Sequence, residues 1–241
     1  MSSRVRAVIW DFDNTLVDSR EKNLAVTRRI VGRLFGSWER FAFLGSLESY
    51  EVVLRRTTNW RDLYRTEFGL NEDEVDAAGR LWTELQFEDR TEVAVYPGVP
   101  EVLHRLRHLP QGIVSQNCRR NIRGALEAGA LQSFFRVVIG YEEVHLRSQK
   151  PAPDGFLMCA GLLEALTSGV LVYVGDHETD VECAANANAE LGRRGSEVRV
   201  VSVGADYGRD GANLEWSIEP DHRARSPEDV ARIVEVIEGA S

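Results

Sequence analysis

The chain has only two lysines, three cysteines and no long apolar run among its 241 residues. Crossing a bilayer takes roughly 20 consecutive apolar residues, so we expect no membrane partner. The N-terminal stretch becomes acidic too early for a secretory signal, and we therefore expect a cytoplasmic protein. The cysteines are odd in number and far apart, which suits neither a disulfide framework nor a zinc site. We expect all three to be reduced and structural: Cys118, Cys159 and Cys183.

Lysine is scarce in a chain that otherwise uses arginine. Lys22 and Lys150 are the only lysines among 29 basic residues. A position that keeps lysine against this bias is a candidate for a site that needs a compact ammonium group. The formal net charge of −9 argues against nucleic acid and anionic membranes as main partners, although a local basic pocket can still hold a small anion.

The apolar runs indicate an α/β fold. Short runs rich in β-branched residues, bounded by turn signals, predict buried parallel strands at 5–10, 112–115, 137–140, 171–175 and 198–203. Helical patterns lie between or after them, at 99–108, 120–128, 154–166, 180–191 and 227–238. Alternation of this kind is typical of a Rossmann-like, doubly wound parallel sheet. Residues 1–16 and 96–241 are assigned to this core.

The segment 17–95 interrupts the alternation, because it shows no convincing strand. Val75, Ala78, Trp82 and Leu85 recur at helical spacing, and Asn71 with Glu74 fits an N-terminal capping pair. A second apolar stripe ends at Gly69 and comprises Trp60, Leu63, Tyr64 and Phe68. We therefore predict a helical cap domain over 17–95, inserted directly after the first strand.

Polar residues follow each of the first four expected strands. Ligands of doubly wound sheets bind beyond the carboxyl ends of the strands, so these residues are expected to converge. They are Asp11, Asp13 and Thr15 after the first strand, Ser115, Gln116 and Asn117 after the second, Lys150 after the third, and Asp176 and Asp180 after the fourth. Carboxylates suit Mg²⁺, and a lysine and a hydroxyl suit the remaining oxygens of a phosphoryl group.

Four short motifs in this set resemble those of the haloacid dehalogenase superfamily. They are DFDNT from Asp11, the strand that ends in Ser115, Lys150 followed by proline, and GDHETD from Gly175 to Asp180. The stretches YPGVPEVLHRLR and KPAPDGF are similar to the phosphoglycolate-phosphatase-like branch, which carries a helical cap after the first motif. The resemblance departs at Asn14, where many relatives have glycine; asparagine also adopts unusual backbone angles.

The resemblance implies a role for each motif residue. Asp11 would attack phosphorus and form an aspartyl-phosphate, while Asp13 would give a proton to the leaving alcohol and later take one from water. Lys150 and Ser115 would stabilise the phosphoryl oxygens. The implied Mg²⁺ ligands are Asp11, the backbone carbonyl of Asp13 and Asp176, with Asp180 contributing directly or through water. The implied substrate contacts are Phe12, Asp13, Thr15, Ser115, Gln116 and Lys150.

The resulting prediction is a Mg²⁺-dependent phosphatase that hydrolyses a small phosphorylated metabolite, phosphoglycolate being one candidate. A homo-oligomer is a further expectation. A phosphomutase remains an alternative, because the same aspartates serve that reaction, and so does a catalytically silent binding module. A signalling receiver also combines acidic residues, a hydroxyl, a lysine and Mg²⁺, but receivers are about half this length and carry the phosphoacceptor after the third strand.

Overall fold

The first structural unit is built on a six-stranded sheet. The computed structural model describes residues 4–57, 59–209 and 216–239. The strand order is β5-β4-β1-β6-β7-β8, and every neighbouring pair in it is parallel. The strands are β1 (Val5–Trp10), β4 (Gln111–Val114), β5 (Val137–Ile139), β6 (Gly169–Gly175), β7 (Val198–Ala205) and β8 (His222–Ala224). The prediction of a doubly wound α/β fold is confirmed.

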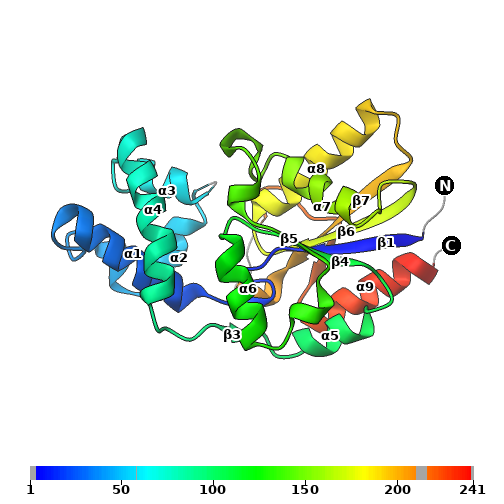
Figure 1. Ribbon diagram of the computed structural model, residues 1–241, viewed down its shortest axis with the longest axis horizontal. Coiled ribbons are helices and arrows are strands. Elements are labelled where there is room, and N and C mark those ends of the chain that lie inside the picture. Colours follow the sequence, from blue (N-terminus) through cyan, green and yellow to red (C-terminus); the bar gives the residue numbers. More distant parts are fainter. Residues whose placement is uncertain (1–3, 58, 210–215, 240–241) are drawn as a thin grey trace. The chain divides into compact units, whose positions relative to one another are not determined.

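Helices cover both faces of this sheet (Figure 1). One face carries α7 (Asp154–Leu162) and α8 (Glu178–Arg193), and the other carries α5 (Val99–Arg105) and α9 (Pro227–Gly239). A fifth helix, α6 (Arg119–Ala128), connects β4 to β5. Burial on both sides explains why the strands are continuous apolar runs rather than alternating ones. Short 3₁₀ turns complete the unit at Gln132–Phe134, Tyr141–Glu143, Leu146–Ser148 and Asp206–Arg209.

Two elements of this unit differ from the sequence prediction. Strand β8 was not expected, because three residues with two exposed polar side chains carry too little apolar signal. The helix expected over 154–166 ends at Leu162, and Glu164 just beyond it has a φ of 58°. A residue in the left-handed conformation cannot continue an α-helix. Because this residue is a glutamate and not a glycine, the sequence did not mark the end of the helix.

The second unit, residues 19–93, is helical. It contains α1 (Arg20–Phe35), a 3₁₀ turn (Ala42–Gly45), α2 (Leu47–Leu54), α3 (Trp60–Thr66) and α4 (Glu72–Glu88). The expected capping pair forms: Asn71 Oδ1 accepts from the Glu74 N–H at 3.1 Å, and Glu74 Oε2 accepts from the Asn71 N–H at 2.9 Å. The unit has its own apolar core, in which Leu63, Val75 and Leu85 are buried.

The helical unit of the structure spans residues 19–93, where the insert was expected over 17–95. Val17–Asp18 (β2) and Ala94–Val95 (β3) pair as a short antiparallel ribbon, so a strand stands at each end of a segment predicted to lack one. Both belong to the unit formed by residues 1–18 and 94–241. Strands of only two residues form through their pairing and leave no periodic pattern in the sequence that would predict them.

Among the described residues, no helix combines the length and apolarity needed to cross a bilayer.

Candidate active site

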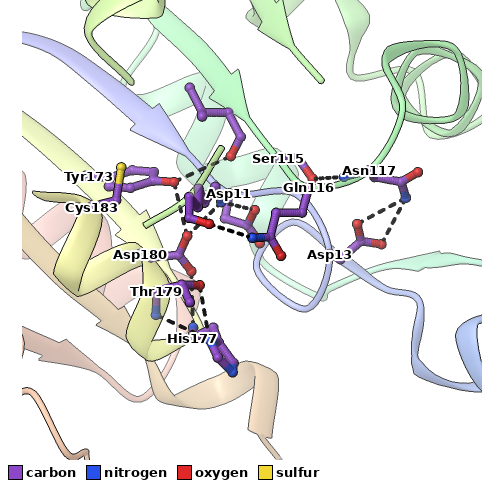
Figure 2. A network of polar contacts seen from close by, with 12 residues as sticks. Asp11, Asp13, Ser115, Gln116, Asn117, Tyr173, His177, Thr179, Asp180 and Cys183 are labelled. Atoms are coloured by element: carbon purple, nitrogen blue, oxygen red, sulfur yellow. Dashed lines mark hydrogen bonds and ion pairs between the residues drawn. The ribbon is translucent and has the colours of Figure 1, made fainter. Parts of the chain in front are cut away.

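The order of the strands brings the motif residues to one edge of the sheet. Strands β4, β1 and β6 are neighbours, so the residues after them share the carboxyl end of the sheet. Asp11 follows β1, Ser115 follows β4 and Asp176 follows β6, while Lys150 arrives on the connection between β5 and α7. Figure 2 shows Asp11 and Ser115 at this edge, with Asp180 from the start of α8 beside them.

Lys150 joins two carboxylates. Its Nζ lies 2.6 Å from Asp11 Oδ1 and 2.7 Å from Asp180 Oδ1, and its side chain is only 5% exposed. Burial alone would lower the pKa of Lys150, but the two carboxylates raise it above its usual value, so the side chain stays an ammonium. The unusual lysine of the sequence is therefore a buried cation at the centre of the site.

Asp11 belongs to a buried acidic triad. The ligand oxygens of Asp11, Asp176 and Asp180 all lie within 4.8 Å of one another. Burial raises the pKa of Asp11 well above its usual value; Lys150 opposes this shift, and the neighbouring carboxylates add to it. Three carboxylates thus meet one ammonium at this point. Hard carboxylate oxygens gathered so closely fit Mg²⁺, so the donor set suits the cation that the resemblance implies.

Asp180 is held by three donors. Its Oδ1 accepts from Lys150 Nζ and, at 3.0 Å, from the Tyr173 hydroxyl, while its Oδ2 accepts from the His177 N–H at 3.1 Å. An ideal Cβ at residue 175 would lie 2.3 Å from Asp180 Cγ, so Gly175 leaves the space that this side chain fills. Asp180 is therefore occupied in orienting Lys150, and of its about four lone-pair sites one is left for a metal ion or for a water bound to it.

Tyr173 was missed by the sequence analysis. It lies within β6, is 1% exposed, and burial followed by the charge of Asp180 raises the pKa of its hydroxyl well above the usual value. The hydroxyl therefore stays protonated and donates a hydrogen bond to Asp180 Oδ1. A tyrosine in an expected buried strand must find a partner for its hydroxyl, and that requirement is the signal that points to it.

Asp13 stands apart from the acidic triad. Its carboxylate accepts from Asn117 Nδ2, at 3.1 Å to Oδ2 and 3.4 Å to Oδ1, and Figure 2 shows it turned toward Asn117 and away from Asp11. The two aspartates of the first motif thus have separate partners, Lys150 for Asp11 and Asn117 for Asp13. With its carboxylate turned toward Asn117, Asp13 would meet a metal ion through its backbone carbonyl, as the resemblance implies.

The residues after β4 hold one another in place. Ser115 is 5% exposed; its N–H donates to Ile139 O and its Oγ accepts from the Asn117 N–H, both at 3.0 Å. Gln116, expected to contact substrate, donates through Nε2 to the Lys150 backbone carbonyl at 3.1 Å. Its side chain therefore braces the lysine loop in this structure.

The loop after β1 is buried and tightly bonded. Phe12 is 2% exposed, so its side chain is buried in the core and does not face a substrate in this structure. Thr15 is fully buried: its carbonyl accepts from the Tyr207 hydroxyl at 2.9 Å, and its Oγ1 has no hydrogen-bond partner among the described residues. Asn14 has a φ of 58°, which agrees with the tolerance expected for asparagine there.

Comparison with known proteins identifies the family. Residues 8–192 match the sequence profile of the haloacid dehalogenase-like hydrolases. The chain belongs to this family. The superfamily assignment made from the four motifs is thereby confirmed, as is the prediction of an enzyme, and the alternative of a signalling receiver is wrong.

Two curated relatives and one solved structure illustrate the relationship. Human N-acylneuraminate-9-phosphatase is 30% identical over 205 residues, which cover 77% of this chain and 80% of that protein. Pyrophosphatase PpaX of Listeria monocytogenes is 27% identical over 195 residues, covering 78% and 82%. A crystal structure from Lactobacillus plantarum, described as a phosphoglycolate phosphatase, superposes with a TM-score of 0.74 at 18% identity, covering 95% and 99%. That last likeness supports the fold.

Proposed function

We propose that this haloacid dehalogenase-like hydrolase is a Mg²⁺-dependent phosphatase that cleaves a small phosphomonoester through an aspartyl-phosphate on Asp11. The observation that carries the proposal is the buried contact of Lys150 with both Asp11 and Asp180, next to Asp176. A nucleophilic carboxylate, one fixed cation and a set of oxygen ligands at one strand edge are the parts that phosphoryl transfer needs. Names of the relatives, which are phosphatases or pyrophosphatases, also favour hydrolysis.

The reaction would proceed in two displacements. An oxygen of Asp11 forms a bond to phosphorus while the bond from phosphorus to the leaving oxygen breaks, and Asp13 gives its proton to that oxygen. Water then attacks the same phosphorus, Asp13 takes a proton from it, and Asp11 is released with inorganic phosphate. Lys150 balances charge on Asp11 and on the phosphoryl oxygens, and Ser115 is placed to donate to them.

Asp11 and Asp176, with the Asp13 carbonyl, would hold the Mg²⁺ ion. A bound Mg²⁺ would neutralise phosphoryl charge and offset the repulsion within the triad. Asp180 would contribute through its hold on Lys150, because its oxygens already accept three hydrogen bonds.

Phosphate release from a panel of small phosphomonoesters tests the proposal. The panel should include phosphoglycolate, sugar phosphates and N-acylneuraminate 9-phosphate, each with and without Mg²⁺, and the enzyme should be compared with Asp11→Asn. The amide has the same shape as the carboxylate but cannot form the acyl-phosphate. Glu235→Gln is a matched control, because it removes a carboxylate that pairs with Arg105 on the surface of the same unit.

Release that needs both Asp11 and Mg²⁺ would support the proposal. Release that survives in Asp11→Asn would contradict it. If wild type released no phosphate but moved a phosphoryl group between positions of a sugar phosphate, the phosphomutase alternative would replace it. If Asp11 were never phosphorylated by any compound, the silent binding module would be the better interpretation.

A further inference from the structure

We infer that Asn117 is a positioning residue for Asp13: its side-chain amide holds the carboxyl group of the proton donor in the orientation that the leaving oxygen requires. The inference rests on the proposed phosphatase function and adds a residue to it. Asn117 lies two positions beyond Ser115, outside the four motifs, and the sequence placed it at a strand end without giving it a role. Its contact with Asp13 spans 104 positions of the chain.

The orientation of the Asn117 amide is fixed by its own partners. Its Oδ1 accepts from the Cys118 N–H at 2.8 Å and from Asn121 Nδ2 at 3.2 Å, while the backbone N–H of Asn117 donates to Ser115 Oγ at 3.0 Å. With the oxygen so engaged, the amide nitrogen is the atom that faces Asp13, and the flipped arrangement is excluded. Asn117 is 8% exposed, so water competes little for these bonds.

A proton donor must lie within hydrogen-bond reach of the atom it protonates, in the right direction. The Asp13 carboxyl group turns about two side-chain bonds, and it is not part of the buried triad that fixes Asp11. The Asn117 amide lies nearer to Asp13 Oδ2, at 3.1 Å, than to Oδ1, at 3.4 Å, so it fixes the plane of the carboxyl group while holding Oδ1 the more weakly of the two for proton exchange with the leaving group or with water. Asn117 supplies that donor, from a loop anchored at the first turn of α6.

This role makes a prediction that a purely structural role does not. An alkyl phosphate expels a strongly basic alkoxide, so its cleavage depends on proton donation, whereas p-nitrophenyl phosphate expels a phenolate that needs little help. The value of kcat/KM covers the steps up to departure of the leaving group. Misplacing Asp13 should therefore lower kcat/KM for the alkyl ester far more than for the aryl ester.

The experiment measures kcat/KM for p-nitrophenyl phosphate and for the best alkyl phosphate of the panel, in wild type, Asn117→Ala and Asn117→Asp. The aspartate variant keeps the shape and the oxygen that accepts from the Cys118 N–H, and it replaces the donor by a second carboxylate beside Asp13. Asn117→Ala removes the donor without adding charge, and melting temperatures check the folding of both variants. We expect the alkyl ester to lose about 10- to 100-fold and the aryl ester less than about 3-fold. The matched control is Asn188→Asp, whose amide bonds the backbone of Val200 within the core unit and should leave the ratio unchanged.

A double-mutant cycle with Asp13→Asn closes the test. If Asn117 acts through Asp13, Asp13→Asn should show the same selective loss, and adding Asn117→Ala to it should cost nothing further. Equal losses on both esters, or additive losses in the double variant, would overturn the inference while leaving the phosphatase intact. A wild type that releases phosphate from neither ester would overturn the proposed function and this inference together.

Discussion

The carbonyl oxygen of Asn14 occupies the space that a side chain on Gly208 would need. An ideal Cβ at residue 208 would lie 1.8 Å from that oxygen. Next to this contact, the Tyr207 hydroxyl donates to the Thr15 carbonyl. The loop that follows the proposed nucleophile, Asp11, therefore packs against the turn Asp206–Arg209 at the end of β7. Such a close approach of two backbones requires glycine.

Gly208→Ala should damage both stability and activity. The new methyl group would meet backbone rather than a movable side chain, so one of the two segments must shift, at a cost of about 1–3 kcal/mol in the free energy of unfolding. Urea unfolding and kcat/KM for the best substrate would measure the two effects. Gly192→Ala in α8 is the matched control: its Cβ meets nothing within 4 Å, and a helical alanine should be neutral or stabilising. If both variants had the same stability and the same kcat/KM, the close contact between Gly208 and the Asn14 carbonyl would not constrain the loop.

Tyr173→Phe should weaken the hold on Asp180. The variant removes the hydroxyl that donates to Asp180 Oδ1 at 3.0 Å and leaves the packing of the ring in place. Hydrogen bonds to charged groups contribute about 1.5–3 kcal/mol, so we expect a loss of stability of that order and a lower kcat. Tyr64→Phe is the control, because the Tyr64 hydroxyl is buried in the helical unit without a hydrogen bond of normal geometry among the described residues. A Tyr173→Phe enzyme as stable and as fast as wild type would show that Lys150 and the His177 N–H suffice.

Lys150→Arg should be nearly as inactive as Lys150→Ala. The ammonium fits between two carboxylate oxygens at 2.6 and 2.7 Å in a buried site, and a planar guanidinium cannot take the same place. We expect kcat to fall by orders of magnitude in both variants. Lys150→Ala should also lose about 3–5 kcal/mol of stability, because it leaves buried carboxylates without their cation. Lys22→Arg, which changes the other lysine, should retain wild-type kcat. An active Lys150→Arg enzyme would refute the requirement for a compact cation.

Mg²⁺ should raise the melting temperature of wild type and not that of Asp176→Asn. A ligand that binds the folded state alone stabilises it by about 2.7 kcal/mol at a concentration of 100 times its dissociation constant. The readout is independent of turnover, and NaCl at matched ionic strength controls for screening of the triad. A thermal shift of equal size in both proteins would place the ion elsewhere than among Asp11, Asp176 and the Asp13 carbonyl.

The sequence predicted the parts of the site that depend on strand ends. Buried apolar runs fixed where Asp11, Ser115 and Asp176 stand, and the parallel order of a doubly wound sheet brought them together. The relative directions of the two first-motif aspartates were not predictable, because they follow from partners far away in the chain: Lys150 for one and Asn117 for the other. Periodicity describes elements, whereas these contacts depend on how loops from different elements meet.

The buried cysteines predict a loss of stability at alkaline pH. Burial raises the pKa of Cys183 to about 12 from its usual value near 9. Below pH 9 the thiol is neutral in both states and stability is unaffected. Between 9 and 12 the unfolded chain loses this proton and the folded chain does not, so each pH unit should lower the free energy of unfolding by about 1.4 kcal/mol per such thiol.

Cys183→Ala isolates this contribution. The variant leaves a small cavity and should be less stable than wild type at pH 7, but its stability should fall less steeply from pH 9 to 10.5, because one titrating group is gone. Urea unfolding at several pH values measures the difference between the two curves, in which all other titrating groups cancel. Parallel curves would mean that Cys183 ionises as readily in the folded protein as in the unfolded chain, and would contradict the burial of its thiol between α8, to which it belongs, and Ala152 beyond Lys150.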